Sequence, residues 1–183
     1  MVEGGKNVSA MIWCCNTSDD PFRRMFLNKR YAQASVAFRR AGRDQEAAIC
    51  DAYLQREKAL LISTTASVAR TQAFVTAANA FITCARDTPS KQANERLTYY
   101  GAAGGCFSKA HDLKNAGDSY RTAGQYAMAA RAYRQGGYFD ELVNVMTQHR
   151  DALNSGLLER LTEAVQTHYS KVRFNERLVS EYL

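Results

Sequence analysis

The sequence contains little proline and no long apolar run. Only two of its 183 residues are proline, Pro21 and Pro89. Proline interrupts the helical hydrogen-bond ladder, whereas alanine, abundant from Ala32 onward, has the lowest helical cost, so the chain favours helix. No apolar run approaches the roughly 18 residues that span a bilayer, and we expect no membrane partner.

Paired cysteine motifs and a secretory signal are also missing. The cysteines, Cys14, Cys15, Cys50, Cys84 and Cys106, have no metal-ligand spacing. They are expected to be free thiols in a reducing compartment, with ligands or disulfides as the less favoured alternatives. Residues 1–15 lack a sustained apolar core before a cleavage site, so we expect a cytoplasmic or nuclear protein.

Catalytic motifs are absent as well. The stretch GAAGGCFSKA, residues 101–110, is the nearest to a phosphate-binding loop, but Ala110 stands where a magnesium-binding hydroxyl is needed. Its glycines are expected to permit close helix approach, the alternative being nucleotide contact. His111, His149 and His168 have no metal-binding spacing, and the first two are expected near helix ends. We therefore predict no catalytic residues, metal or cofactor, and a chain that is not itself an enzyme.

An eleven-residue pattern recurs along the chain. It has an aromatic first residue, alanine fourth, a small residue seventh, an aromatic eighth and a small residue eleventh. It occurs at residues 31–41, 74–84, 100–110, 113–123 (with leucine first) and 126–136, with a degenerate copy at 139–149. The last four copies start thirteen residues apart, enough for a short helix and a turn.

The repeated positions fall on one helical face, because their offsets approximate the 3.6-residue period. They predict a packing seam of small residues beside aromatic rings. Its members are Tyr31, Ala34, Phe38, Phe74, Ala77, Phe81, Tyr100, Ala103, Phe107, Ala116, Tyr120, Ala129 and Tyr133. We predict an all-α fold, an α-solenoid of antiparallel helix pairs over a single domain at residues 19–183, after an extended or disordered segment at residues 1–18.

Caps and breakers predict the helix boundaries. One helix is expected over residues 19–42, with Asp20 as cap, Pro21 in the first turn and Gly42 as stop. Further helices are expected over residues 43–62, 67–87 and 89–110, then three short ones separated by left-handed glycines at 124 and 136–137. Asp112 and Asp118 are candidate helix starts, although Asp118 fits a helix interior equally well. Two helices, from residues 155 and 175, close the chain.

The net charge of +6 is unevenly distributed. No acid lies between Pro21 and Arg43, whereas the cations of that stretch are Arg23, Arg24, Lys29, Arg30, Arg39, Arg40 and Arg43. The first expectation is a solvated helix face. The alternatives are contact with the phosphates of nucleic acid or with an acidic protein partner.

Two family resemblances follow from these segments. The spacing Ala-x3-Phe/Tyr-x2-Ala, as in Ala34, Phe38 and Ala41, resembles the second helix of tetratricopeptide repeats, without their 34-residue period. The ordered run of YAQASVAFRRAG, DAYLQREKA, AANAFITCAR, ERLTYYGAAGGCFSKA, residues 116–146 and LLERLTEAV resembles a helical region of large fungal proteins. These carry a UvrD-like superfamily-1 helicase core and belong to the tetratricopeptide and ankyrin repeat-containing group.

The resemblance implies an accessory helical module that follows a helicase core. We therefore expect a non-catalytic module that binds a protein partner or a neighbouring domain of the same polypeptide. The alternative is an accessory nucleic-acid-binding module that uses the basic first helix. A structural spacer is the third interpretation.

Overall fold

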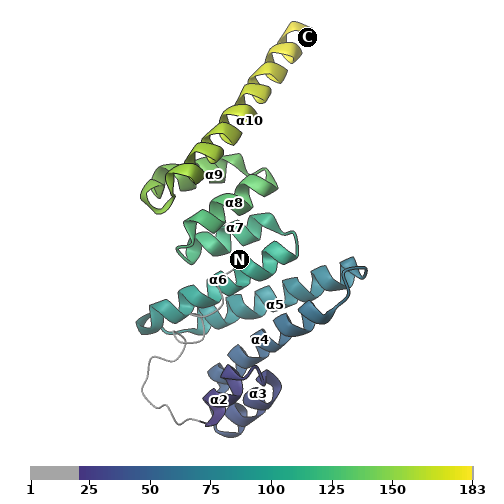
Figure 1. Ribbon diagram of the computed structural model, residues 1–183, viewed down its shortest axis with the longest axis vertical. Helices are drawn as coiled ribbons and strands as arrows, with labels where there is room; N and C mark the ends of the chain where they lie inside the picture. The colour runs from purple at the N-terminus through teal and green to yellow at the C-terminus, as the bar shows by residue number, and fades with distance from the viewer. Residues whose placement is uncertain (1–20, 183) are drawn as a thin grey trace. The chain divides into compact units, whose positions relative to one another are not determined.

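The computed structural model describes residues 21–182, with side chains for all of them except Arg23 and residues 174–182. Every regular element in this range is helical, comprising nine α-helices and two short 3₁₀ helices without a strand (Figure 1). The predicted all-α class is confirmed. The prediction for residues 1–18 falls outside the described range.

The chain divides into two compact units, Met1–Asp112 and Leu113–Leu183, each of which is described by itself. The single domain predicted over residues 19–183 stays a prediction. The first unit contains α2 (Pro21–Leu27), α3 (Tyr31–Arg40), α4 (Asp44–Leu61), α5 (Ser67–Asp87), η1 (Ser90–Gln92) and α6 (Ala93–Lys109). Each α-helix of this unit packs on the next in sequence, and α4, α5 and α6 are the longest (Figure 1).

The second unit is built on the same principle from shorter helices. It contains α7 (Leu113–Thr122), α8 (Tyr126–Gly136), α9 (Phe139–Gln148), η2 (Arg150–Ala152) and α10 (Ser155–Tyr182). Helix α8 packs against both α7 and α9, and α10 contacts α8 and α9. The three short helices with a thirteen-residue step are therefore confirmed.

The prediction of one helix over residues 19–42 is wrong. The chain turns between α2 and α3, where Lys29 adopts a left-handed conformation with φ of 59°. In a straight helix, Phe22 and Phe38 would lie about 24 Å apart along the axis. The turn folds α2 back, so that their ring centroids lie 5.5 Å apart. The aromatic contact that α2 gains by folding back offsets the strain at Lys29.

The C-terminal prediction is also wrong. In place of two helices, α10 runs without interruption from Ser155 to Tyr182. The residues between the two expected helices, Arg173 and Phe174, include neither proline nor glycine. Nothing in the backbone therefore stops the hydrogen-bond ladder at that point.

The helix-ending turns repeat as closely as the packing face does. Gly124 and Gly137 are left-handed, with φ of 71° and 77°, as predicted for helix ends, whereas Gly136 closes α8 itself. The residue after each left-handed glycine donates its N–H to the carbonyl of the eighth-position aromatic, five residues back. These bonds are Gln125 to Tyr120 and Tyr138 to Tyr133, both 2.9 Å, and Arg43 to Phe38, also 2.9 Å, across Gly42. This is the Schellman arrangement, which satisfies carbonyls left free at a helix end.

Helix α6 ends in the same turn without a glycine. His111 takes the left-handed position with φ of 58°, and Asp112 donates to the Phe107 carbonyl at 3.0 Å. The side chain of His111 is exposed. Histidine is one of the few residue types found repeatedly in this conformation, although it pays a steric cost that glycine avoids.

We expect His111→Gly to stabilise the protein. The left-handed backbone costs a non-glycine residue about 1–2 kcal/mol, and glycine avoids this cost. Glycine also loses more conformational freedom on folding, which offsets about 0.5–1 kcal/mol of the stabilisation. The free energy of unfolding, measured by urea denaturation, should therefore rise by roughly 0.5–1 kcal/mol. The reverse change, Gly124→His, should lower it by a similar amount. Unchanged stability in both variants would contradict this account.

Candidate functional site

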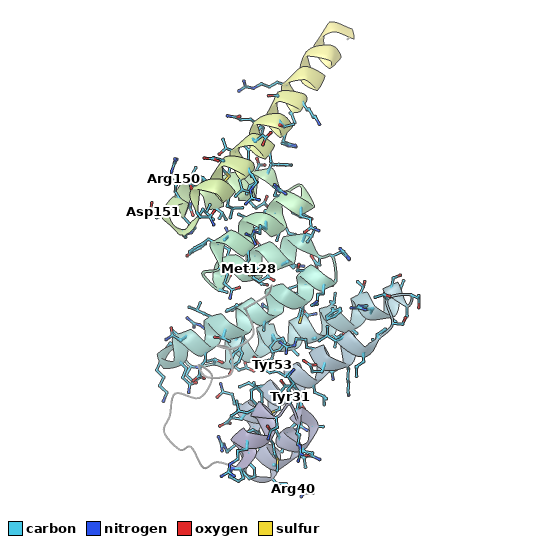
Figure 2. The ribbon with its side chains drawn as sticks, in the orientation of Figure 1. Tyr31, Arg40, Tyr53, Met128, Arg150 and Asp151 are labelled. Atoms are coloured by element: carbon cyan, nitrogen blue, oxygen red, sulfur yellow. The ribbon has the colours of Figure 1, made fainter. Side chains whose placement is uncertain are left out.

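The predicted seam residues of α3 and α5 are buried together. Ala34, Phe38, Phe74, Ala77 and Phe81 have no exposed surface, and Tyr31 is 6% exposed. Tyr53 of α4 joins the two sets, because its ring stacks on Tyr31 at 5.4 Å and meets the edge of Phe81 at 4.9 Å. Figure 2 shows Tyr31 and Tyr53 close together in this unit. The aromatic positions thus hold three successive helices to one another.

Helix α6 uses a slightly different face. Ala103 and Phe107 are buried, but Tyr100 is only half-buried and Tyr99 is completely buried in its place. Tyr99, Ala103 and Cys106 are spaced by four and three residues, which is a better helical stripe than one starting at Tyr100. The eleven-residue pattern therefore places the α6 seam one residue too late at its start. The Tyr99 hydroxyl has no hydrogen-bond partner among the described residues.

In the second unit, α7 and α8 come into close contact through a glycine. Ala116, Tyr120, Ala129 and Tyr133 are all buried seam residues. Gly117 lies against the ring of Tyr133, where an added Cβ would be 2.3 Å from Cε1. A side chain of any size at this position would therefore push the two helices apart.

A charged network accompanies this contact. Asp118 lies within α7, as one of the two alternatives predicted, and accepts a 2.7 Å hydrogen bond from the Tyr133 hydroxyl. It also lies 3.4 Å from Lys114, which forms a 2.8 Å ion pair with Glu141 of α9. The hydrogen bond between Lys114 and Glu141 raises the pKa of the Lys114 ammonium and lowers the pKa of the Glu141 carboxyl. Polar contacts thus link α7, α8 and α9 outside the apolar seam.

The basic residues predicted for the first helix are divided between α2, α3 and their turns. Arg39 pairs with Asp51 of α4, which also accepts a 2.6 Å hydrogen bond from Ser35. Arg43 pairs with Glu46 at 3.0 Å and lies over the Phe38 ring at 4.6 Å from its centroid. Two members of the predicted cluster are therefore engaged in holding α3 and α4.

The other basic side chains of the predicted cluster that the structure describes are exposed, and most of them have no ion-pair partner among the described residues. Arg24, Lys29, Arg30 and Arg40 have exposed side chains, and that of Arg23 is outside the description. Lys29, Arg30 and Arg40 form no ion pair with any described residue. Figure 2 shows Arg40 extending outward from the end of α3. Lys29, Arg30 and Arg40 are thus the members that are both exposed and outside any ion pair with described residues.

An apolar groove lies between α2 and α3, and Arg40 is the one cation among its lining residues. It has a volume of about 470 Å³ and is lined by Met25, Ala32, Gln33, Val36, Ala37 and Arg40. Val36 is 47% exposed within it, although valine is usually buried. We call this feature the α2–α3 groove.

A second groove lies in the other unit, between α8, α9 and α10. Its volume is about 640 Å³, and its lining includes Arg134, Phe139, Arg160, Glu163, His168 and Lys171. No motif in the sequence predicts this basic groove as a site. The available signal is the spacing of residues 160, 163, 164, 167, 168 and 171, which all fall on one face of a helix.

The described cysteines and histidines form no metal site. Cys50, Cys84 and Cys106 are buried free thiols, as predicted, and burial raises the pKa of Cys50 to about 12. No group of three or more potential metal ligands occurs among the residues that the structure describes. His111 follows α6 and His149 caps α9, where its ring stacks on Tyr126 at 3.6 Å. Gly101, Gly104 and Gly105 lie inside α6 rather than in a loop after a strand.

Comparison of the chain with known proteins identifies no similar protein. No protein-family model, curated protein or solved structure matches this chain. Within residues 21–182, no helix has the length and apolarity required to cross a membrane. The candidate surfaces are therefore interpreted from their own geometry and charge.

The Gly117 contact generates a stability prediction. We expect Gly117→Ala to lower the free energy of unfolding by about 1–3 kcal/mol, because the new methyl group overlaps the buried ring of Tyr133. Urea denaturation monitored by circular dichroism measures the effect. The matched control is Gly156→Ala in α10, where nothing lies within 4 Å of the added Cβ.

Gly156→Ala should leave stability unchanged or raise it by up to about 1 kcal/mol, because alanine is the better helix former. The close approach of α7 and α8 would be refuted if the two alanine variants proved equally stable.

Proposed function

We propose that the chain is a non-catalytic, tetratricopeptide-like helical-repeat module that mediates protein–protein or inter-domain contact. The observation that carries this proposal is the α2–α3 groove, where Val36 remains 47% exposed beside Arg40. An apolar patch rimmed by polar residues is typical of a protein interaction surface. Packing of each helix mainly on its sequence neighbours supports the proposal, since α-solenoids bind partners on the surfaces left open.

The proposed occupant of the α2–α3 groove is a neighbouring domain of the same polypeptide. The helical segments resemble those that follow a UvrD-like helicase core, so this core is the first partner to test. The missing phosphate-binding and nucleophile motifs agree with an accessory role, in which the chemistry belongs to the partner.

We expect the purified chain to form a saturable complex with that helicase core, measured by isothermal titration calorimetry. Val36→Glu should weaken binding by about tenfold or more, because it places a charge in an apolar contact. The matched control is Val68→Glu, at a residue 82% exposed at the start of α5, which should change affinity less than about twofold.

Absence of a complex would refute the proposal for this partner. Equal losses in the two valine variants would show that the α2–α3 groove is not the contact surface. Both substitutions are at exposed positions, so circular dichroism should confirm that each variant is folded.

An accessory nucleic-acid-binding module is the second candidate. It is favoured by Lys29, Arg30 and Arg40, which are exposed and form no ion pair with described residues. Such cations release counterions when they contact phosphates, and binding then weakens steeply with salt.

For this candidate we expect single- or double-stranded oligonucleotides to bind at low salt. Arg30→Glu combined with Arg40→Glu should reduce the slope of log affinity against log salt by about 2, one unit for each lost phosphate contact. Lys91→Glu, at an exposed position in η1, is the charge-matched control for a single reversal. The candidate fails if no binding occurs at low salt or if the double variant binds like the unmodified protein.

A further inference from the structure

The basic groove is built on one face of α10. Its α10 lining residues include Arg160, Glu163, His168 and Lys171, which recur at intervals of three to five positions. Arg134 of α8 and Phe139 of α9 complete the lining from the other helices of the same unit. Three helices of the same unit therefore contribute to the groove.

The charge of the lining is unbalanced. Arg134, Arg160 and Lys171 have exposed side chains, whereas Glu163 is the one carboxylate that lines the groove. None of the three cations forms an ion pair with a described residue. Elsewhere in the same unit, Lys114 is paired with both Asp118 and Glu141. The groove therefore retains positive charge that the surrounding structure does not neutralise.

One of these cations is held in place by the helix backbone. The Nε of Arg160 donates a 2.9 Å hydrogen bond to the carbonyl of Gly156, one turn earlier in α10. Its two terminal nitrogens form no hydrogen bond with described residues. A guanidinium held in this way presents donors to a carboxylate at a reduced entropic cost.

The aromatic rings of the lining are already packed on each other. Phe139 and His168 stack with centroids 4.0 Å apart and planes inclined by 13°, and Tyr169 meets His168 edge-on at 5.2 Å. The Tyr169 hydroxyl donates to Asp140, next to Phe139 in sequence. The rings thus form an aromatic wall that their mutual contacts hold in place.

We propose that the basic groove binds an acidic linear peptide segment of a protein partner. Carboxylates of the segment would pair with Arg134, Arg160 and Lys171, while its apolar atoms would lie against the Phe139–His168 pair. This inference rests on the proposed interaction function and adds a second surface with a defined ligand chemistry.

The same observations disfavour single-stranded nucleic acid. Such ligands need an uninterrupted basic track and aromatic faces on which bases can stack. Glu163 interrupts the track, and Phe139 and His168 each use one ring face on the other. A peptide tolerates both features, because its carboxylates can be spaced to avoid Glu163.

The length of the peptide follows from helix geometry. Arg160 and Lys171 are eleven residues apart in α10, a rise of about 16 Å. An extended peptide covers this distance with about five residues. A probe of about 12 residues therefore spans the groove with flanking residues to spare.

The experiment is a fluorescence anisotropy titration with a labelled peptide of about 12 residues in which glutamate alternates with serine. The full chain is titrated at low salt, about 50 mM. We expect saturable binding that weakens with salt and is lost when glutamine replaces glutamate in the probe. Arg160→Glu combined with Lys171→Glu should weaken binding by about tenfold or more.

The control is Arg173→Glu, which reverses a charge at one site of the same helix, where the test variant reverses two. Arg173 is exposed and lies two residues beyond Lys171, which places it about 200° around the helix and off the groove face. It should change affinity less than about twofold. A thymidine oligonucleotide of matched charge is titrated in parallel.

Three outcomes overturn the proposal. These are equal binding of the glutamate and glutamine peptides, equal affinity of the double variant and the unmodified chain, and tighter binding of the oligonucleotide with the same dependence on Arg160 and Lys171. Titrating the helicase core against the double variant separates the two proposals. A chain that binds the core through Val36 but ignores the acidic peptide keeps its proposed function and loses only this groove site.

Discussion

In four repeats, the aromatic ring at the eighth position is buried while its own carbonyl accepts the hydrogen bond that ends the helix. Phe38, Phe107, Tyr120 and Tyr133 share both roles. The ring fixes which face of the helix packs inward, and the carbonyl fixes where the chain turns toward the next helix. Because packing and turning are set by one residue, a short sequence pattern is enough to define a helix and its connection.

This arrangement concentrates the apolar contacts of each unit between sequence neighbours and leaves charged side chains at the outer surfaces. Some of those charges are used internally, as with Arg39 and Asp51 or Lys114 and Glu141. Others remain without an ion-pair partner among described residues, notably in the basic groove and at the turn between α2 and α3. Both proposed contact surfaces therefore follow from the same construction. Side chains that are not used in packing between helices stay available to bind a partner.

The prediction from sequence succeeds where the signal is local. The bounds of α5 and the three short helices follow from periodicity and glycine positions, which act within a few residues. It fails at Lys29, because the gain that breaks the helix is the contact of Phe22 with Phe38, which periodicity does not encode. The choice of Tyr99 over Tyr100 for burial has a similar origin, since it depends on the rotation of α6 against its neighbours.

The sequence by itself determined that the chain is helical, where most helices begin and end, and which small and aromatic residues are buried. Those properties depend on the backbone and on the 3.6-residue period. Only the tertiary structure decided which cations are paired and which are available. Arg39 forms an ion pair with Asp51 of another helix, whereas Arg134, Arg160 and Lys171 line the same groove. Charge pairing depends on distances of a few ångströms between segments far apart in sequence, and composition carries no record of them.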